Sequence, residues 1–161
     1  MDKKLEKLIN EQINKELFSS YLYLAMAAYF DANNLPGCAH WMKKQAAEEN
    51  NHAMKFYAFM NDRGSRVVLD AIDKPQAEYS SIKEVFKKSL EHEKKVTASI
   101  NNIYAAAKAC GDTAAEVMLH WFINEQVEEE KNVMDILAQL QVVKEDSAAV
   151  LFFDKHLGKR E

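Results

Sequence analysis

Apolar residues recur every three to four positions along most of the chain, which is the spacing of one face of an α-helix. Residues that end helices interrupt this pattern, such as Pro36 and Gly37 after the first segment and Gly111 after the third. Four long helices and a short C-terminal one are therefore expected at residues 3–33, 37–63, 81–109, 113–142 and 147–157. Asp146 or Ser147 is expected to cap the short helix.

The lengths of the connections predict how these helices are arranged. The first and second helices are joined by a few residues, as are the third and fourth, so each pair is expected to form an antiparallel hairpin. Residues 65–79 have no helical period and can span roughly 50 Å when extended, enough to run the length of a helix of about 40 Å. The expected fold is all-α, a four-helix bundle with one long crossover between the second and third helices.

Composition narrows the class of protein. The chain of 161 residues has only four glycines and two prolines, which favours long helices in a single domain, 1–161. Its formal net charge of −4 argues against a nucleic-acid partner. No apolar run approaches the length of a membrane span, and two lone cysteines without a disulfide framework suggest a reducing compartment. We therefore expect a cytoplasmic protein with no nucleic-acid or membrane partner.

Two polar residues interrupt the apolar face of the second expected helix. Glu49 and His52 are three positions apart, so they lie about one turn apart on the face that also carries Met42 and Phe56. A carboxylate in an apolar core is costly unless it is protonated, paired or bound to a metal. A lone Glu-x-x-His pair is usually a surface pair, so its meaning depends on the other helices.

Each of the other long helices also has a glutamate on its apolar face. Glu16, Glu93 and Glu129, like Glu49, lie within roughly one turn of their helix midpoints, so all four are expected at one level of the bundle. Four carboxylates and the imidazole of His52 cannot stay charged in an apolar core without cations, and two divalent ions would balance them. Oxygen-rich ligation with one histidine suits iron or manganese better than structural zinc.

The segments around these residues resemble those of the non-haem bacterial and archaeal ferritins. The resemblance covers essentially the whole chain and is carried by residues 10–17 (NEQINKEL), 45–53 (QAAEENNHA), 91–93 (EHE) and 121–130 (WFINEQVEEE). It implies a ferroxidase that oxidises Fe(II) with dioxygen or peroxide at a di-iron centre. It also implies self-association into a hollow shell of 24 subunits that stores ferric mineral.

By position, the resemblance makes Glu16, Glu49 and His52 the ligands of the first iron. Glu49, as a bridge, would bind the second iron together with Glu93 and Glu129. The chain would thus hold two irons at its ferroxidase centre. Ferritin-like di-iron proteins commonly place such glutamates on facing helices of a bundle.

The resemblance adds further residues around this centre. Gln126 would lie beside the second iron, and Tyr23 matches a tyrosine that can donate a hydrogen bond or an electron. A third, weaker iron site of the prokaryotic members corresponds to Glu48, Glu125, Glu128 and Glu129. A solvated acidic strip is the alternative interpretation of this last group.

Departures from related patterns separate this chain from its relatives. Asn50 stands where haem-binding bacterioferritins carry a methionine, so no haem is expected. Gln126 and Glu129 stand where symmetric di-iron proteins have a second Glu-x-x-His, so the two irons should be held unequally. The main alternative is a DNA-protecting mini-ferritin of twelve subunits, which usually lacks a terminal helix. No sequence feature excludes a di-iron oxygenase acting on an organic substrate, but such chains are usually much longer. A catalytically silent ferritin subunit would lack the ligands of the centre, which are all present here.

Overall fold

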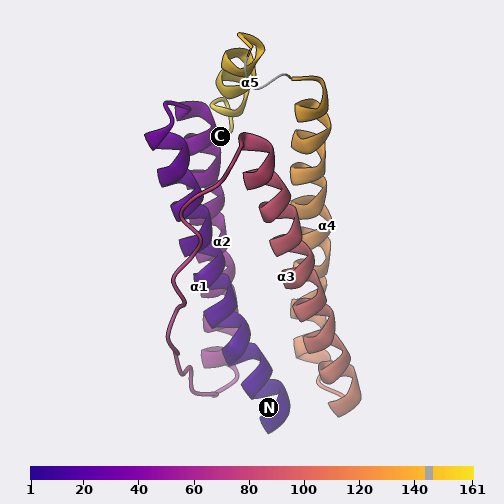
Figure 1. Ribbon diagram of the computed structural model, residues 1–161. Coiled ribbons are helices and arrows are strands. Elements are labelled where there is room, and N and C mark those ends of the chain that lie inside the picture. Colours follow the sequence, from indigo (N-terminus) through magenta and orange to yellow (C-terminus); the bar gives the residue numbers. More distant parts are fainter. Residues whose placement is uncertain (144–146) are drawn as a thin grey trace.

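Five α-helices make up most of residues 1–143 and 147–161, the parts of the chain that the computed structural model describes. They are α1 (Lys3–Ala32), α2 (Pro36–Asp62), α3 (Ile82–Cys110), α4 (Thr113–Val142) and α5 (Ala149–Leu157). The first four form a four-helix bundle and α5 lies across one end of it (Figure 1), so the predicted fold class is confirmed. No helix in the described residues is both long and apolar enough to span a membrane.

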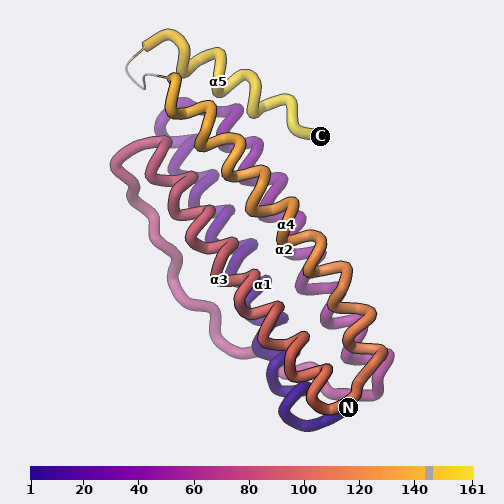
Figure 2. Tube along the Cα trace, turned by 90° about the vertical axis from the view of Figure 1, so that its right-hand side faces the viewer, coloured from indigo at the N-terminus to yellow at the C-terminus, as the bar shows by residue number. Residues whose placement is uncertain are grey.

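The crossover between α2 and α3 is an extended segment without helix or strand, and it runs along the outside of α1 (Figures 1 and 2). Two asparagines one turn apart on α1 bind its backbone. Asn10 accepts a hydrogen bond from the amide of Val68 at 2.8 Å, and Asn14 donates one to the carbonyl of Ala71 at 2.9 Å. These side chains replace the backbone partners that an extended segment otherwise lacks.

The fifth helix is attached to its own bundle through the start of α2. Asp154 of α5 accepts hydrogen bonds from the backbone amides of Gly37 at 3.0 Å and Cys38 at 2.8 Å. This carboxylate caps α2, whose own N-cap residue Leu35 makes no capping hydrogen bond. The approach requires glycine, because a Cβ atom on Gly37 would lie 1.8 Å from the carbonyl oxygen of Asp154.

The start of α5 differs from the prediction. The helix begins at Ala149, and the residue before it, Ala148, occupies the N-cap position without a side-chain hydrogen bond. Ser147 is therefore not the cap, and Asp146 lies outside the described residues. The helix is held by the contact of Asp154 with α2 rather than by a cap of its own.

The apolar core consists of two clusters along the bundle axis. One includes Phe30 and Phe86 and lies near α5, and the other includes Ile9, Phe56 and Phe122 toward the opposite end. The rings of Phe56 and Phe122 are stacked with their centroids 3.9 Å apart. The buried polar side chains of the long helices lie between the two clusters.

Candidate metal centre

The four glutamates predicted from the sequence are all buried, and each comes from a different helix. Glu16 of α1, Glu49 of α2 and Glu93 of α3 are 1% exposed, and Glu129 of α4 is 2% exposed. His52, one turn after Glu49, is also buried. These five side chains make a polar layer across the middle of an apolar bundle, an arrangement that needs protons or cations to neutralise it.

Glu16, Glu49 and His52 form the more buried of two compact groups. One potential ligand atom from each residue lies within 4.8 Å of the others, and Glu49 Oε2 is 3.4 Å from His52 Nδ1. Among the described residues, Glu16 Oε2 is the one buried side-chain oxygen or nitrogen without a hydrogen-bond partner. An unsatisfied buried oxygen is costly. A proton shared between the carboxyls of Glu16 and Glu49, or a cation bound by these three residues, would supply its missing partner. The group therefore fits a metal site.

The side chains predicted to bind the second iron accept hydrogen bonds from two side-chain amides and one tyrosine hydroxyl. Glu49 Oε1 and Glu129 Oε2 both accept hydrogen bonds from the amide nitrogen of Gln45, at 3.1 and 2.7 Å. Glu93 accepts one from the hydroxyl of Tyr23 and one from the amide nitrogen of Gln126 at 3.3 Å. Tyr23 and Gln126 thus lie directly against one carboxylate of the layer.

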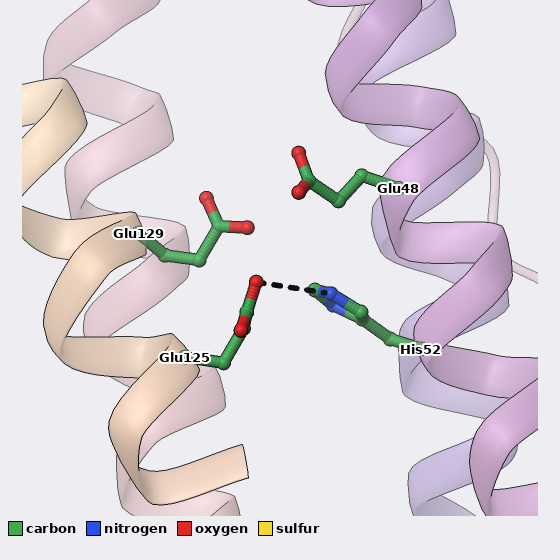
Figure 3. Close-up of side chains that lie close together, drawn as sticks. All are labelled: Glu48, His52, Glu125 and Glu129. Atoms are coloured by element: carbon green, nitrogen blue, oxygen red, sulfur yellow. Dashed lines mark ion pairs between the residues drawn. The ribbon is translucent and has the colours of Figure 1, made fainter. Parts of the chain in front are cut away.

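A second compact group joins α2 to α4 (Figure 3). Glu48 and His52 of α2 and Glu125 and Glu129 of α4 point toward one another, with one potential ligand atom from each within 4.8 Å of the others. Glu128, which the resemblance also assigns to the third site, is exposed and lies outside this group. It is nevertheless near enough for its charge to contribute to the raised pKa of Glu125, after burial and the charge of Glu48.

His52 belongs to both groups, but its two ring nitrogens face different partners. Nδ1 faces Glu49, and Nε2 is 3.8 Å from Glu125 Oε1. A histidine that binds a metal through one nitrogen usually donates its other N–H to a carboxylate or carbonyl. The geometry therefore suits Nδ1 for the metal site with Glu49 and Nε2–H for Glu125. The rings of Trp121 and Phe122 lie edge-on to the imidazole and fix its orientation.

Burial is the largest cause of raised pKa values throughout the polar layer. It raises the pKa of Glu16, Glu49 and Glu93, and the charge of a neighbouring carboxylate raises that of Glu16 and Glu49 further. Burial, followed by the charges of Glu49 and Glu93, raises the pKa of Glu129 to about 9. The pKa of Tyr23 is raised by burial and by Glu93, which keeps its hydroxyl protonated as a donor. Without metal, the layer therefore holds protons at neutral pH, and cations binding there would displace them.

Comparison with known proteins identifies the family. The profile of the ferritin-like domain matches residues 6–143. The chain belongs to the ferritin-like family. A probable bacterial non-heme ferritin-like protein of Haemophilus influenzae is 40% identical over 152 residues, which are 94% of this chain and 92% of that protein. The bacterial non-heme ferritin of Staphylococcus epidermidis is 39% identical over 160 residues, 99% of this chain and 96% of that protein.

Solved ferritin structures show the same architecture. An open-pore ferritin from the hyperthermophilic archaeon Archaeoglobus fulgidus superposes with a TM-score of 0.98 at 42% identity, covering 100% of this chain and 98% of that chain. The predicted resemblance to the non-haem ferritins is therefore confirmed, together with the bundle and its short C-terminal helix.

In this member of the ferritin-like family, two glutamines that were not among the predicted site residues support the polar layer. Gln12 donates a hydrogen bond to Glu16 at 2.8 Å, just as Gln45 does to Glu49, and each glutamine stands four residues before its glutamate. The hydroxyl of Ser99 donates to the amide oxygen of Gln12 at 2.6 Å, which orients that amide. A glutamine four residues before a buried glutamate is a signal that the sequence already contains.

Proposed function

We propose that this chain is an iron-storage ferritin. In this proposal it binds Fe(II) at the buried polar layer, oxidises it to Fe(III) with dioxygen or peroxide, and stores ferric mineral inside a shell of 24 subunits. The observation that carries the proposal is the layer of four carboxylates from four helices with the unsatisfied oxygen of Glu16, in a chain of the ferritin-like family.

The substrate ions would be held unequally. Glu16, Glu49 and His52 would bind the first Fe(II). Glu49, Glu93 and Glu129 would bind the second, and rotation of the carboxylates away from their present amide partners would bring their oxygens together. Carboxylate oxygens are hard ligands, so they favour Fe(III) over Fe(II) and promote loss of an electron. Two ferrous ions supply the two electrons that reduce one dioxygen to peroxide.

Neighbouring side chains would orient the carboxylates, and the carboxyls themselves would release protons when metal binds. Tyr23 and Gln126 donate hydrogen bonds to Glu93 and so fix the direction of its oxygens. The protons that the metal-free layer holds would leave as Fe(II) enters, which keeps the loaded site close to electrical neutrality. Because the pKa of Glu129 is raised to about 9, this carboxyl keeps its proton at physiological pH until a metal ion displaces it.

We further propose that Glu48, Glu125 and Glu129 bind a third and weaker iron, with Glu128 at its edge. The grouping of these residues around the outer side of His52 supports this site (Figure 3). Because Glu48 and Glu125 are only partly buried, the site is nearer to solvent than the other two. An iron ion bound there would be passing between the di-iron centre and the stored mineral.

Assembly into a shell is supported by the apolar surface that one chain leaves uncovered. Val142 at the end of α4 is 84% exposed, and Leu151 and Phe152 of α5 are 64% and 76% exposed. Such residues usually pack against other subunits. Cys38 and Cys110 are free thiols, which suits the cytoplasmic location that we propose. The mini-ferritin alternative is not favoured, because all the proposed ligands come from one bundle and a fifth helix follows α4.

The central experiment is anaerobic titration of the metal-free protein with Fe(II), followed by exposure to air. Wild-type protein should bind two or three Fe(II) per chain and oxidise them rapidly. The double variant Glu49→Ala, His52→Ala should lose rapid oxidation, whereas Asn51→Ala, a change on the exposed side of the same turn, should not. Unchanged oxidation rates in the double variant would contradict the site.

The size of the particle tests the shell independently of the chemistry. Twenty-four chains of 18.4 kDa give about 440 kDa by sedimentation or light scattering. A particle of half that mass would instead indicate the twelve-subunit architecture.

A further inference from the structure

The chain beyond α5 brings an arginine to the edge of the proposed third iron site. Arg160 forms an ion pair with Glu48, with 2.6 Å between Nη2 and Oε2. Its Nη1 donates a hydrogen bond to the amide oxygen of Gln45 at 2.8 Å. The guanidinium also lies over the ring of Trp41, 4.5 Å from its centroid. One side chain of the C-terminal tail thus contacts the same carboxylate that would bind the third ion.

The tail holds this arginine in place at several points. The backbone carbonyl of Arg160 accepts a hydrogen bond from His40 Nε2 at 2.8 Å. Asp154 anchors the preceding helix to the start of α2. The side chain of Arg160 is only 20% exposed, so its pairing with Glu48 is screened by water less than an ordinary surface pair would be.

Glu48 carries one negative charge, which cannot fully serve both a guanidinium and a metal ion. Its carboxylate is one of the four groups whose ligand atoms lie within 4.8 Å of one another, beside Glu125 and Glu129. A divalent ion in that group would also be repelled by the fixed positive charge of Arg160. Occupation of the site by metal and docking of the arginine therefore oppose each other.

We propose that Arg160 is an intramolecular competitor for the third iron. Its guanidinium holds Glu48, and an ion bound by Glu48, Glu125 and Glu129 opens that pair and loosens the tail. The inference rests on the proposed function, because it assumes that this cluster binds iron. The tail keeps the third site weak and reversible, as a transit site requires. Coupling between two sites is reciprocal, so the factor by which Arg160 weakens iron binding equals the factor by which iron weakens tail docking.

The first test measures the affinity of the third ion. Anaerobic calorimetric titration of the assembled protein with Fe(II) should give a third dissociation constant that falls roughly 5- to 150-fold in Arg160→Gln, the usual range for coupled sites. Arg160→Lys retains the charge and should stay closer to wild type. Lys159→Gln removes the same charge from an exposed neighbour in the tail and should leave the third constant unchanged.

The outcomes separate this inference from the proposed function. Absence of the first two Fe(II) equivalents in the wild type would contradict the di-iron centre. If those two bind normally, absence of a third equivalent would overturn the proposed third site and this inference together. A third constant that Arg160→Gln does not alter would overturn the inference alone. An equal effect of Lys159→Gln would also overturn it, because the effect would then be general electrostatics.

The second test observes the tail rather than the iron. Amide hydrogen exchange of residues 155–161 should be faster with three Fe(II) equivalents than with two, measured anaerobically by mass spectrometry. In Arg160→Gln the exchange should already be fast with two equivalents, and the third should change it little. Slower or unchanged exchange in the wild type on addition of the third equivalent would refute the coupling.

Discussion

Replacement of Glu129 by glutamine tests whether the metal-free polar layer holds protons. Burial, with the charges of Glu49 and Glu93, raises the pKa of Glu129 from 4.5 to about 9. In the folded protein Glu129 therefore keeps a proton that the unfolded chain releases above about pH 4.5. The stability that comes from this proton is complete below about pH 4.5 and is lost as the pH rises through about 9.

The expected size of the effect follows from this difference in pKa. Between about pH 6 and 8, one such carboxyl lowers the free energy of unfolding by about 1.4 kcal/mol per pH unit, or roughly 3 kcal/mol over the interval. Glutamine has nearly the same shape and does not titrate. From about pH 6 to 8, the free energy of unfolding of metal-free Glu129→Gln should therefore fall by roughly 3 kcal/mol less than that of the metal-free wild type.

Urea unfolding followed by circular dichroism measures this difference, in the presence of a chelator and at one protein concentration. Glu128→Gln is the matched control, because Glu128 is the exposed neighbour on the same helix. It should show the same pH dependence as the wild type. Equal pH dependence in the wild type and in Glu129→Gln would refute the reasoning, since it would mean that Glu129 is ionised in the metal-free protein.

Three further predictions address packing, the fifth helix and metal uptake. Phe56→Ala should lower the free energy of unfolding by about 3–5 kcal/mol in urea titrations, because Phe56 is fully buried and stacked on Phe122. Asp154→Ala should cost about 1–2 kcal/mol and speed hydrogen exchange in the first turn of α2, because it removes both acceptors of that cap. Metal binding at neutral pH should release protons and weaken as the pH falls, because the carboxyls of Glu16 and Glu49 have raised pKa values. Calorimetry in two buffers of different ionisation enthalpy measures that release, and an identical heat in both would contradict it.

The sequence predicts the arrangement of the helices and the level of the four glutamates for simple physical reasons. Apolar spacing defines the buried face of each long helix, and the crossover length gives the direction of α3. A glutamate at the midpoint of that face, such as Glu16 or Glu93, lies in the middle of the bundle whichever way its helix runs. Such residues are predictable because they depend on position within one helix.

Features that depend on contacts between distant segments could not be predicted in this way. Arg160 is 112 residues from Glu48 in the sequence, and their ion pair depends on how α5 docks and where its tail then runs. The separation of Glu125 from Glu128 depends on the rotation of α4 about its own axis. Because the two residues are three positions apart, helical spacing places both on the same side of α4. It does not show which of them faces α2.

The division of the apolar core into two clusters has a consequence for how the bundle opens. In the part of the chain that the structure describes, the polar layer lies between the Phe30 and Phe86 cluster and the Phe56 and Phe122 cluster. Without metal, that layer is joined by hydrogen bonds and protonated carboxyls, so we expect the two ends of the bundle to open more independently of each other than they would with metal bound. Ions bound by residues from all four helices would connect the two ends of the bundle, so that the bundle unfolds in one cooperative transition. Iron would then be part of the mechanical integrity of the subunit as well as its cargo.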